Sequence, residues 1–139
     1  PRYVSWSRQN RSQLVRIPLV KGDNCRMELR SPDPACNPYL AIGLVLAAGL
    51  DGIEHRMVLQ PPVNKNLFRP GEAEGLGLEM LPATLEEAVA IAEESDFLHK
   101  VLPEELSRRY FAEERARCEA LRAAADPAEY ERIHYFNAI

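Results

Sequence analysis

The sequence predicts an α+β protein, with short antiparallel strands followed by a mostly helical C-terminal half. Two observations carry this prediction. The first 31 residues contain short, weakly alternating segments of valine, leucine, isoleucine and tyrosine, which is typical of strands. After the prolines at 32 and 34, apolar residues recur at helical spacing behind residues that favour helix starts. At 139 residues, the chain has the length of one domain.

Three strand segments are predicted before the first helix. They cover residues 2–8, 13–20 and 25–31, and the turn sequence Lys-Gly-Asp-Asn at 21–24 joins the last two as a hairpin. The stretch 31–34 then ends the sheet, because proline cannot continue a central strand.

A long apolar helix is predicted next, with Asn37 as its cap, Pro38 at its first position and its end near Met57. It is apolar nearly all round, so we expect it to be buried on most sides. A chain of this length leaves little to surround it. Together with a start at Pro1 rather than methionine, this favours a fragment whose missing part lies upstream.

Further helices are predicted from their capping residues. They cover 84 to about 94, 103 to about 123, and 126 to about 135, and a long irregular connection at 60–83 precedes them. The second of these helices is expected to be half buried, because Glu114 interrupts its apolar face. That face comprises Leu106, Tyr110, Phe111, Cys118 and Leu121.

Charge and cysteine content narrow the class of protein. Residues 1–40 hold seven Lys or Arg against three Asp or Glu, although the whole chain carries −4. A basic segment in an acidic chain fits a local anion site better than a nucleic-acid surface. The apolar run 39–50 is too short to span a membrane. Three cysteines without metal-ligand spacing, and no visible signal peptide, favour reduced thiols and a cytoplasmic protein.

The candidate site consists of Arg11, Arg16, Glu28 and Arg30. In one interpretation the arginines bind phosphate or carboxylate oxygens, and Glu28 is one ligand of a hard cation such as Mg²⁺. In the other, these residues are an ordinary strand surface with cross-strand ion pairs of little energetic value. Arg11 and Arg16 differ in parity along the strand, so both reach one ligand only if residues 10–12 form a turn or bulge.

Six motifs stand along the chain in a fixed order: SWSRQNRSQLVRIP (5–18), MELRSPDPACNPYL (27–40), LAAGLDGI (46–53), NLF (66–68), LPATLEEA (81–88) and DPAEYE (126–131). In sequence and spacing they resemble type I glutamine synthetase, a glutamate–ammonia ligase. The resemblance implies that residues 1–139 are the C-terminal portion of that family's catalytic domain. Residues 1–31 would supply active-site strands of its sheet, and 32–139 a helical part with the long loop 60–83.

The resemblance also implies a role for each candidate residue. Arg11 matches an arginine that contacts glutamate and the transferring phosphate. Arg30 matches one that binds glutamate and stabilises the phosphorylated intermediate, so these two are the expected catalytic and substrate-binding residues. Arg16 matches an arginine bound to nucleotide phosphates, which makes Arg11 and Arg16 the expected ATP-binding pair. Glu28 matches a ligand of Mg²⁺, or Mn²⁺ in its place.

The implied reaction is the ATP-dependent ligation of ammonia to L-glutamate through γ-glutamyl phosphate. The implied assembly is a homododecamer of two stacked hexamers, with active sites between neighbouring subunits. The family's other metal carboxylates and its ammonia site are absent from this sequence. We therefore expect the 139-residue chain to be inactive alone.

At two positions the sequence differs from the family, and the family's residue roles are not assigned there. Phe68 stands where some bacterial relatives have a tyrosine that is adenylylated, and without a hydroxyl group that modification is impossible here. The turn 21–24 is one residue shorter than in some relatives, so no nucleotide contact is assigned to Lys21.

Three alternatives remain open. A related glutamate–amine ligase, such as a γ-glutamyl-polyamine or γ-glutamyl-methylamide synthetase, would share these motifs, because the amine pocket lies largely outside this sequence. A non-catalytic anion- or RNA-binding module would use the basic segment and lose affinity steeply with salt. A structural role is the third, in which residues 127–139 dock onto a neighbouring ring rather than pack on their own subunit.

Overall fold

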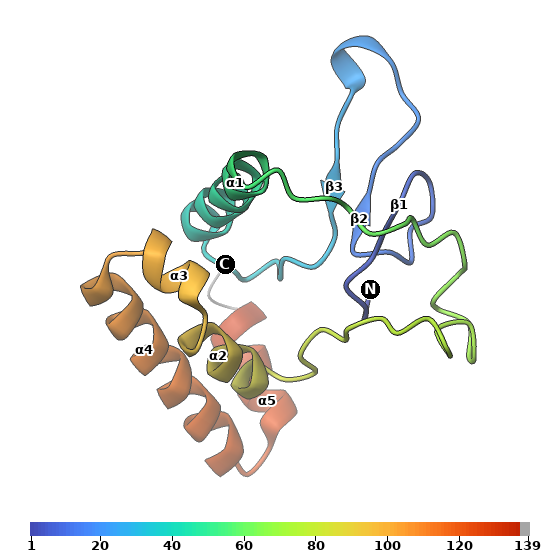
Figure 1. Ribbon diagram of the computed structural model, residues 1–139. Helices are drawn as coiled ribbons and strands as arrows, with labels where there is room; N and C mark the ends of the chain where they lie inside the picture. The colour runs from blue at the N-terminus through green and yellow to red at the C-terminus, as the bar shows by residue number, and fades with distance from the viewer. Residues whose placement is uncertain (137–139) are drawn as a thin grey trace. The chain divides into compact units, whose positions relative to one another are not determined.

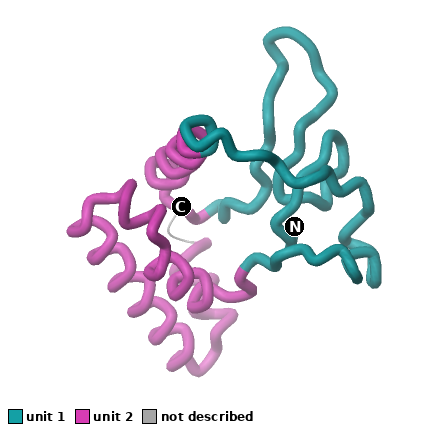
Figure 2. The backbone as a smooth tube through the Cα atoms, viewed as in Figure 1, with its two compact units in different colours: residues 1–34, 52–81 teal, residues 35–51, 82–139 magenta. Residues whose placement is uncertain are grey.

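A computed structural model describes residues 1–136 of the chain (Figure 1). It divides into two compact units (Figure 2). Unit 1 comprises residues 1–34 and 52–81, and unit 2 comprises residues 35–51 and 82–139. The last three residues of the predicted docking segment 127–139 lie outside the described residues.

Unit 1 contains a small three-stranded sheet that confirms the α+β prediction. Its strands are β1 (Trp6–Ser7), β2 (Val15–Arg16) and β3 (Glu28–Leu29), in that order across the sheet. The predicted hairpin between the last two strands is confirmed, since β2 and β3 are antiparallel. The prediction of antiparallel strands is wrong for β1, which runs parallel to β2.

The strands are also much shorter than predicted. The buried Pro18 follows β2 closely and offers no backbone N–H to a ladder. The connection to β3 contains a short 3₁₀ turn, η1 (Gly22–Asn24), in which Gly22 adopts a φ of +65°. The predicted turn is therefore present, but the paired region on either side of it is only two residues long.

The N-terminal segment pairs with a distant part of the chain. Tyr3 forms an isolated antiparallel bridge with Met80, supported by Val4 N–H to the Glu79 carbonyl and Leu81 N–H to the Arg2 carbonyl, both 2.8 Å. The connection 60–83 is irregular, as predicted, yet hydrogen bonds anchor its end to the start of the chain. No periodicity in the sequence indicated this pairing.

Helix α1 (Pro38–Glu54) begins as predicted, because the Asn37 side chain accepts hydrogen bonds from the backbone N–H groups of Tyr39 and Leu40. Its expected burial is wrong for this chain. None of its residues is buried, and Tyr39 is 88% and Ile53 75% exposed. Burial requires other surface to cover an apolar helix, and the described chain does not supply it.

Unit 2 contains four further helices, α2 (Leu85–Glu93), α3 (Asp96–Val101), α4 (Glu104–Ala123) and α5 (Pro127–Glu131), followed by the π-helical turn η2 (Arg132–Phe136). Helices α2, α3 and α5 all contact the long helix α4 (Figure 1). Helix α3 was not predicted. Its signal was Ser95, whose hydroxyl accepts a hydrogen bond from the N–H of Leu98 at the helix start.

The buried face of α4 differs from the predicted apolar stripe. Its buried residues are Ser107, Phe111 and Glu114, while Leu106 is 41% exposed. The side chain of Glu114 is 8% exposed and accepts a hydrogen bond of 2.9 Å from Arg117 one turn later. A carboxylate tolerates such burial when it is paired with a cation, so Glu114 lies within the packed face rather than interrupting it.

Membrane insertion is not supported by the helices of residues 1–136, since none of them is both long and apolar enough to cross a bilayer. The apolar run 39–50 lies within α1, which is likewise not long and apolar enough to cross a bilayer.

The N-cap of α2 gives the first prediction. The Thr84 hydroxyl accepts from Glu87 N–H at 3.1 Å, and the Glu87 carboxylate accepts from Ala83 N–H at 2.7 Å. Thr84→Ala should lower the free energy of unfolding by about 1 kcal/mol, because it removes the acceptor of one helix N–H. Thr84→Ser, the matched control, should keep most of the stability in a urea titration followed by circular dichroism. Equal stabilities for the two variants would contradict this role.

Candidate functional site

Strands β2 and β3 bring two of the four predicted site residues face to face. Arg16 on β2 and Glu28 on β3 are direct register partners across the antiparallel ladder. The Arg16 Nη1 atom donates to both carboxylate oxygens of Glu28 at 2.9 Å, and its Nε donates to the carbonyl of Gln9 at 2.9 Å. The Arg16 side chain is 17% and the Glu28 side chain 25% exposed, so the pair is partly shielded from water.

Two more arginines lie around the same carboxylate. Arg26 Nη2 donates to Glu28 at 3.1 Å, and Arg30 Nη1 lies 4.0 Å from its other oxygen. Arg26 and Arg30 each lie two residues from Glu28 in the sequence, just outside β3. Arg26 was not among the predicted site residues. We call Arg16, Arg26, Glu28 and Arg30 the arginine–glutamate cluster.

The cluster keeps Glu28 ionised. Hydrogen bonds from Arg16 are the largest influence and lower the pKa of the Glu28 carboxyl below its ordinary value. Partial desolvation acts in the opposite direction, and Arg26 adds a further lowering. At neutral pH the site therefore presents one carboxylate among three guanidinium groups.

Arg11 lies apart from this network of contacts. It is exposed on a turn with Ser12, so the turn required by the parity of Arg11 and Arg16 is present. Within residues 1–136, no hydrogen bond or ion pair joins Arg11 to the arginine–glutamate cluster. The contacts thus join Arg16, Glu28 and Arg30, and leave Arg11 outside them.

A metal site is not complete in the described part of the chain. Residues 1–136 contain no group of three or more His, Cys, Asp or Glu side chains able to hold a cation. Glu28 alone fits the donor chemistry of Mg²⁺, because it is an ionised oxygen ligand, and each carboxylate oxygen can accept more than one contact. Glu28 could therefore serve as one of several ligands of the cation.

Both interpretations of the cluster agree with this geometry. The contacts are those of a cross-strand ion pair, which is worth little when exposed. The same arrangement presents Arg30, with 31% of its side chain exposed, and Arg26, with 51%, to any anion that approaches. Guanidinium groups donate paired hydrogen bonds to phosphate and carboxylate oxygens, so the cluster has the chemistry of an anion site.

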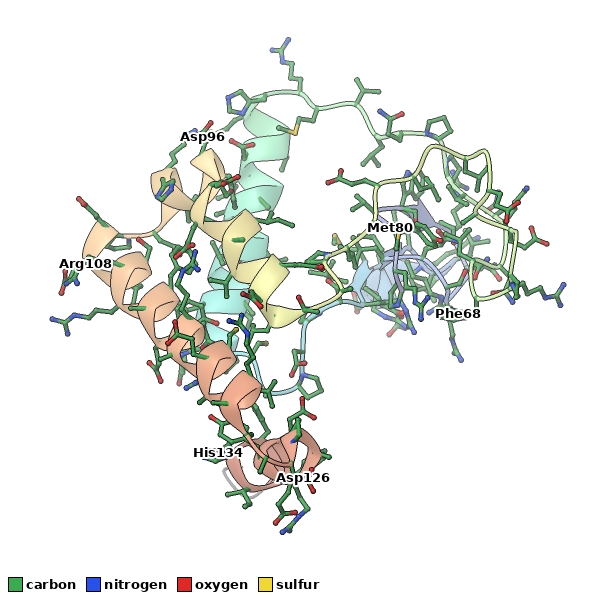
Figure 3. The ribbon with its side chains drawn as sticks, turned by 90° about the horizontal axis from the view of Figure 1, so that it is seen from below. Phe68, Met80, Asp96, Arg108, Asp126 and His134 are labelled. Carbon is green, nitrogen blue, oxygen red and sulfur yellow. The ribbon has the colours of Figure 1, made fainter. Side chains whose placement is uncertain are left out.

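Phe68 lies on the irregular connection of unit 1 (Figure 3). Its side chain is exposed, while the neighbouring Leu67 is buried. A phenyl ring has no hydroxyl to modify, so the exposed position at 68 cannot accept a nucleotidyl group through oxygen.

The fold and the cluster define an α+β chain that carries a carboxylate among arginines on two adjacent short strands. A comparison with protein families identifies this class. Residues 1–133 match the family model described as "Glutamine synthetase, catalytic domain". The chain therefore belongs to the glutamine synthetase catalytic-domain family.

Relatives with curated descriptions agree with this assignment. The chain is 42% identical over 134 residues to a glutamine synthetase of Methanosarcina mazei, covering 95% of this chain and 30% of the relative. It is 40% identical over 126 residues to one of Methanocaldococcus jannaschii, covering 89% and 28%. For a Staphylococcus aureus glutamine synthetase the figures are 36% over 137 residues, covering 97% and 30%. The chain thus spans about 30% of the length of these relatives.

The pKa of Glu28 gives the second prediction. Because its pKa is lowered on folding, the stabilisation from its pairs is present above the ordinary carboxyl pKa and is lost as the pH falls through the lowered value. Arg16→Gln should raise the pKa of Glu28 toward its ordinary value, and Arg26→Gln should raise it less. Carbon-detected NMR titration of the Glu28 carboxyl group measures both changes.

Arg108→Gln is the matched control for that titration. Arg108 lies on α4 and pairs with Glu105, so its removal should leave the Glu28 titration unchanged. A Glu28 midpoint that Arg16→Gln leaves in place would contradict the hydrogen-bonded pair.

Proposed function

We propose that this chain supplies part of the active site of a glutamine synthetase, which joins ammonia to L-glutamate at the expense of ATP through γ-glutamyl phosphate. Membership of the catalytic-domain family supports the reaction class. The single observation that carries the residue roles is the arrangement of Arg16 and Arg30 around the ionised Glu28, within the matched region. The proposed reaction is that of the complete gene product, of which this chain would be a part.

Arg16 is suited to hold a nucleotide phosphate without leaving its strand. Its Nε and Nη1 atoms donate to Gln9 and Glu28, and within residues 1–136 its Nη2 atom has no acceptor. The guanidinium is therefore oriented by protein contacts while two N–H groups stay available. Such a donor binds phosphate with little reorganisation.

Glu28 is the proposed metal ligand. It is ionised and presents hard oxygen donors, as Mg²⁺ and Mn²⁺ prefer. When bound, the cation would reduce the negative charge on the ATP phosphates. Because one carboxylate is not a site, the remaining ligands must come from phosphate, water and residues outside the described chain.

Arg11 and Arg30 are the proposed contacts to glutamate and to the phosphoryl group in transfer. In the first step the glutamate γ-carboxylate oxygen bonds to the γ-phosphorus of ATP, and the bond from that phosphorus to ADP breaks. In the second, ammonia attacks the acyl carbon, loses a proton, and phosphate leaves. Negative charge on phosphoryl oxygens is present throughout, so guanidinium groups close to them would stabilise both steps.

The organisation of the whole protein is part of the same proposal. Residues 1–139 would be the C-terminal portion of the catalytic domain, with 1–31 as its active-site strands and 32–139 as its helical part. ATP, L-glutamate and ammonia would be its substrates, in a cytoplasmic dodecamer of two stacked hexamers. The proposed residues are assigned to ATP, glutamate and the metal, and none of them to the amine.

Removal of Arg30 tests the proposed role directly. In the complete gene product, Arg30→Ala should lower kcat for glutamine formation roughly 100- to 1,000-fold, the usual effect of losing one oriented donor to developing charge. Arg109→Ala is the matched control, since Arg109 is an exposed arginine paired with Glu105 on α4. A coupled assay of phosphate release with glutamate, ammonia and MgATP measures both. Normal turnover of the Arg30 variant would refute the role.

The 139-residue chain by itself gives a second test. We expect no glutamine formation from the purified chain with MgATP, glutamate and ammonia, because one carboxylate cannot complete a metal site. The complete gene product, assayed with ammonia and with larger amines, provides the comparison. Turnover by the isolated chain that depends on both ATP and Mg²⁺ would contradict this expectation. A preference for larger amines would instead favour the related glutamate–amine ligases.

A further inference from the structure

The turn that carries Arg11 is held on both sides by polar side chains. Arg11 itself is exposed, whereas Ser12 is 2% and Gln13 0% exposed. Exposed turns are usually fixed by their own short-range contacts. This one is fixed to a segment more than fifty residues away, through a set of hydrogen bonds that we call the Asn10 clamp: Asn10, Ser12 and Gln13 with the backbone of Lys65 and Leu67.

Asn10 uses both ends of its amide. Its Oδ1 accepts from the backbone N–H of Ser12 at 2.9 Å and from the Ser12 hydroxyl at 2.8 Å, which closes the turn around Arg11. Its Nδ2 donates to the carbonyl of Lys65 at 2.6 Å. One side chain therefore sets the shape of the turn and also joins it to the connection of unit 1.

Ser12 and Gln13 complete the clamp from the other side of Arg11. The Ser12 hydroxyl accepts from the backbone N–H of Leu67 at 2.9 Å. Gln13 donates through Nε2 to the same Lys65 carbonyl at 2.9 Å and accepts from the Ser5 hydroxyl at 2.5 Å. Among the described residues, no buried side-chain nitrogen or oxygen lacks a partner. A fully satisfied buried network has one favoured arrangement, so it fixes the backbone that it joins.

The Arg11 side chain contributes nothing to this arrangement. Within residues 1–136 its guanidinium has no hydrogen-bond or ion-pair partner. The position from which it reaches a ligand is therefore set by the clamp and not by its own contacts. This differs from Arg16, whose guanidinium is itself held by Gln9 and Glu28.

We propose that Asn10, Ser12 and Gln13 are positioning residues, which aim Arg11 at its ligand by fixing its turn to residues 65–67. This inference rests on the proposed function of Arg11. A catalytic group that is displaced by about 1 Å can lose roughly 100-fold in rate, so a rigid turn has a kinetic consequence. The segment that contains Lys65 and Leu67 becomes a second element on which the geometry of the Arg11 site depends.

A double-mutant cycle in the complete gene product tests the proposal. Asn10→Ala should lower kcat/KM for glutamate about 10- to 100-fold in the wild-type background. In the Arg11→Ala background the same change should lower it less than about 2-fold, because a residue that acts through Arg11 has no further effect without it. Asn64→Ala is the matched control; Asn64 offers the clamp only its backbone carbonyl, so kcat/KM should be unchanged.

Two further measurements separate positioning from loss of the fold. Asn10→Asp keeps the acceptor for Ser12 and loses the donor to Lys65, so an intermediate loss is expected. Asn10→Ala should also speed hydrogen exchange at the Leu67 amide, a readout that needs no catalysis. Equal losses from Asn10→Ala in both backgrounds would overturn the proposal, since they indicate general destabilisation.

The outcomes also distinguish this proposal from the proposed function. If Arg11→Ala leaves glutamine formation intact, the role of Arg11 fails and its positioning fails with it. If Arg11→Ala lowers kcat/KM for glutamate and Asn10→Ala does not, only the positioning proposal is overturned.

Discussion

Unit 1 depends on the burial of polar side chains. Ser7, Ser12 and Gln13 are its most completely buried side chains, and burying such groups is costly unless their hydrogen bonds are made. Those bonds have direction, so they determine where the chain lies. The connection 60–83 must therefore present the Lys65 carbonyl and the Leu67 N–H to the turn at Arg11. The same segment provides a partner for Trp6, whose indole N–H donates to the Gln60 carbonyl at 2.6 Å. These hydrogen bonds hold an irregular segment in one position although it has no regular secondary structure.

The arginine–glutamate cluster is built on a different principle. Arg16 and Glu28 are held by the ladder pairing of β2 with β3, and Arg26 and Arg30 flank Glu28 in the sequence. The side chains of the cluster are partly exposed and joined by ion pairs that water can replace. A ligand that competes for Arg26 or Arg30 therefore displaces weak contacts while the frame beneath stays in place. The pairing of β2 with β3 thus fixes Arg16 opposite Glu28, while the charged side chains around this pair stay adaptable.

How much of this the sequence could predict depends on the range of each interaction. Caps at Asn37 and Thr84 were predictable, because each acts within three residues. The hairpin of β2 and β3 was predictable from its turn residues, whereas the register that sets Arg16 opposite Glu28 was not predicted. The Asn10 clamp was not predictable, since its partners are backbone groups more than fifty residues away that carry no sequence signal. The exposure of α1 shows the converse limit: a pattern predicts that a helix needs cover, not that the cover belongs to the same chain.

Salt should affect the charged contacts and the neutral buried contacts of the chain differently. Among the described residues of unit 2, the buried hydrophobic side chains are Val89 and Phe111. Helix α2 is joined to α4 by ion pairs of Arg115 with Glu93 and of Arg122 with Glu86. Charges at the surface are screened at high ionic strength, whereas hydrogen bonds between neutral buried groups are not. Salt therefore acts on the helix contacts of unit 2 and on the arginine–glutamate cluster, but not on the Asn10 clamp. The Asn10 clamp should therefore hold the Arg11 turn at ionic strengths that weaken the ion pairs of the arginine–glutamate cluster.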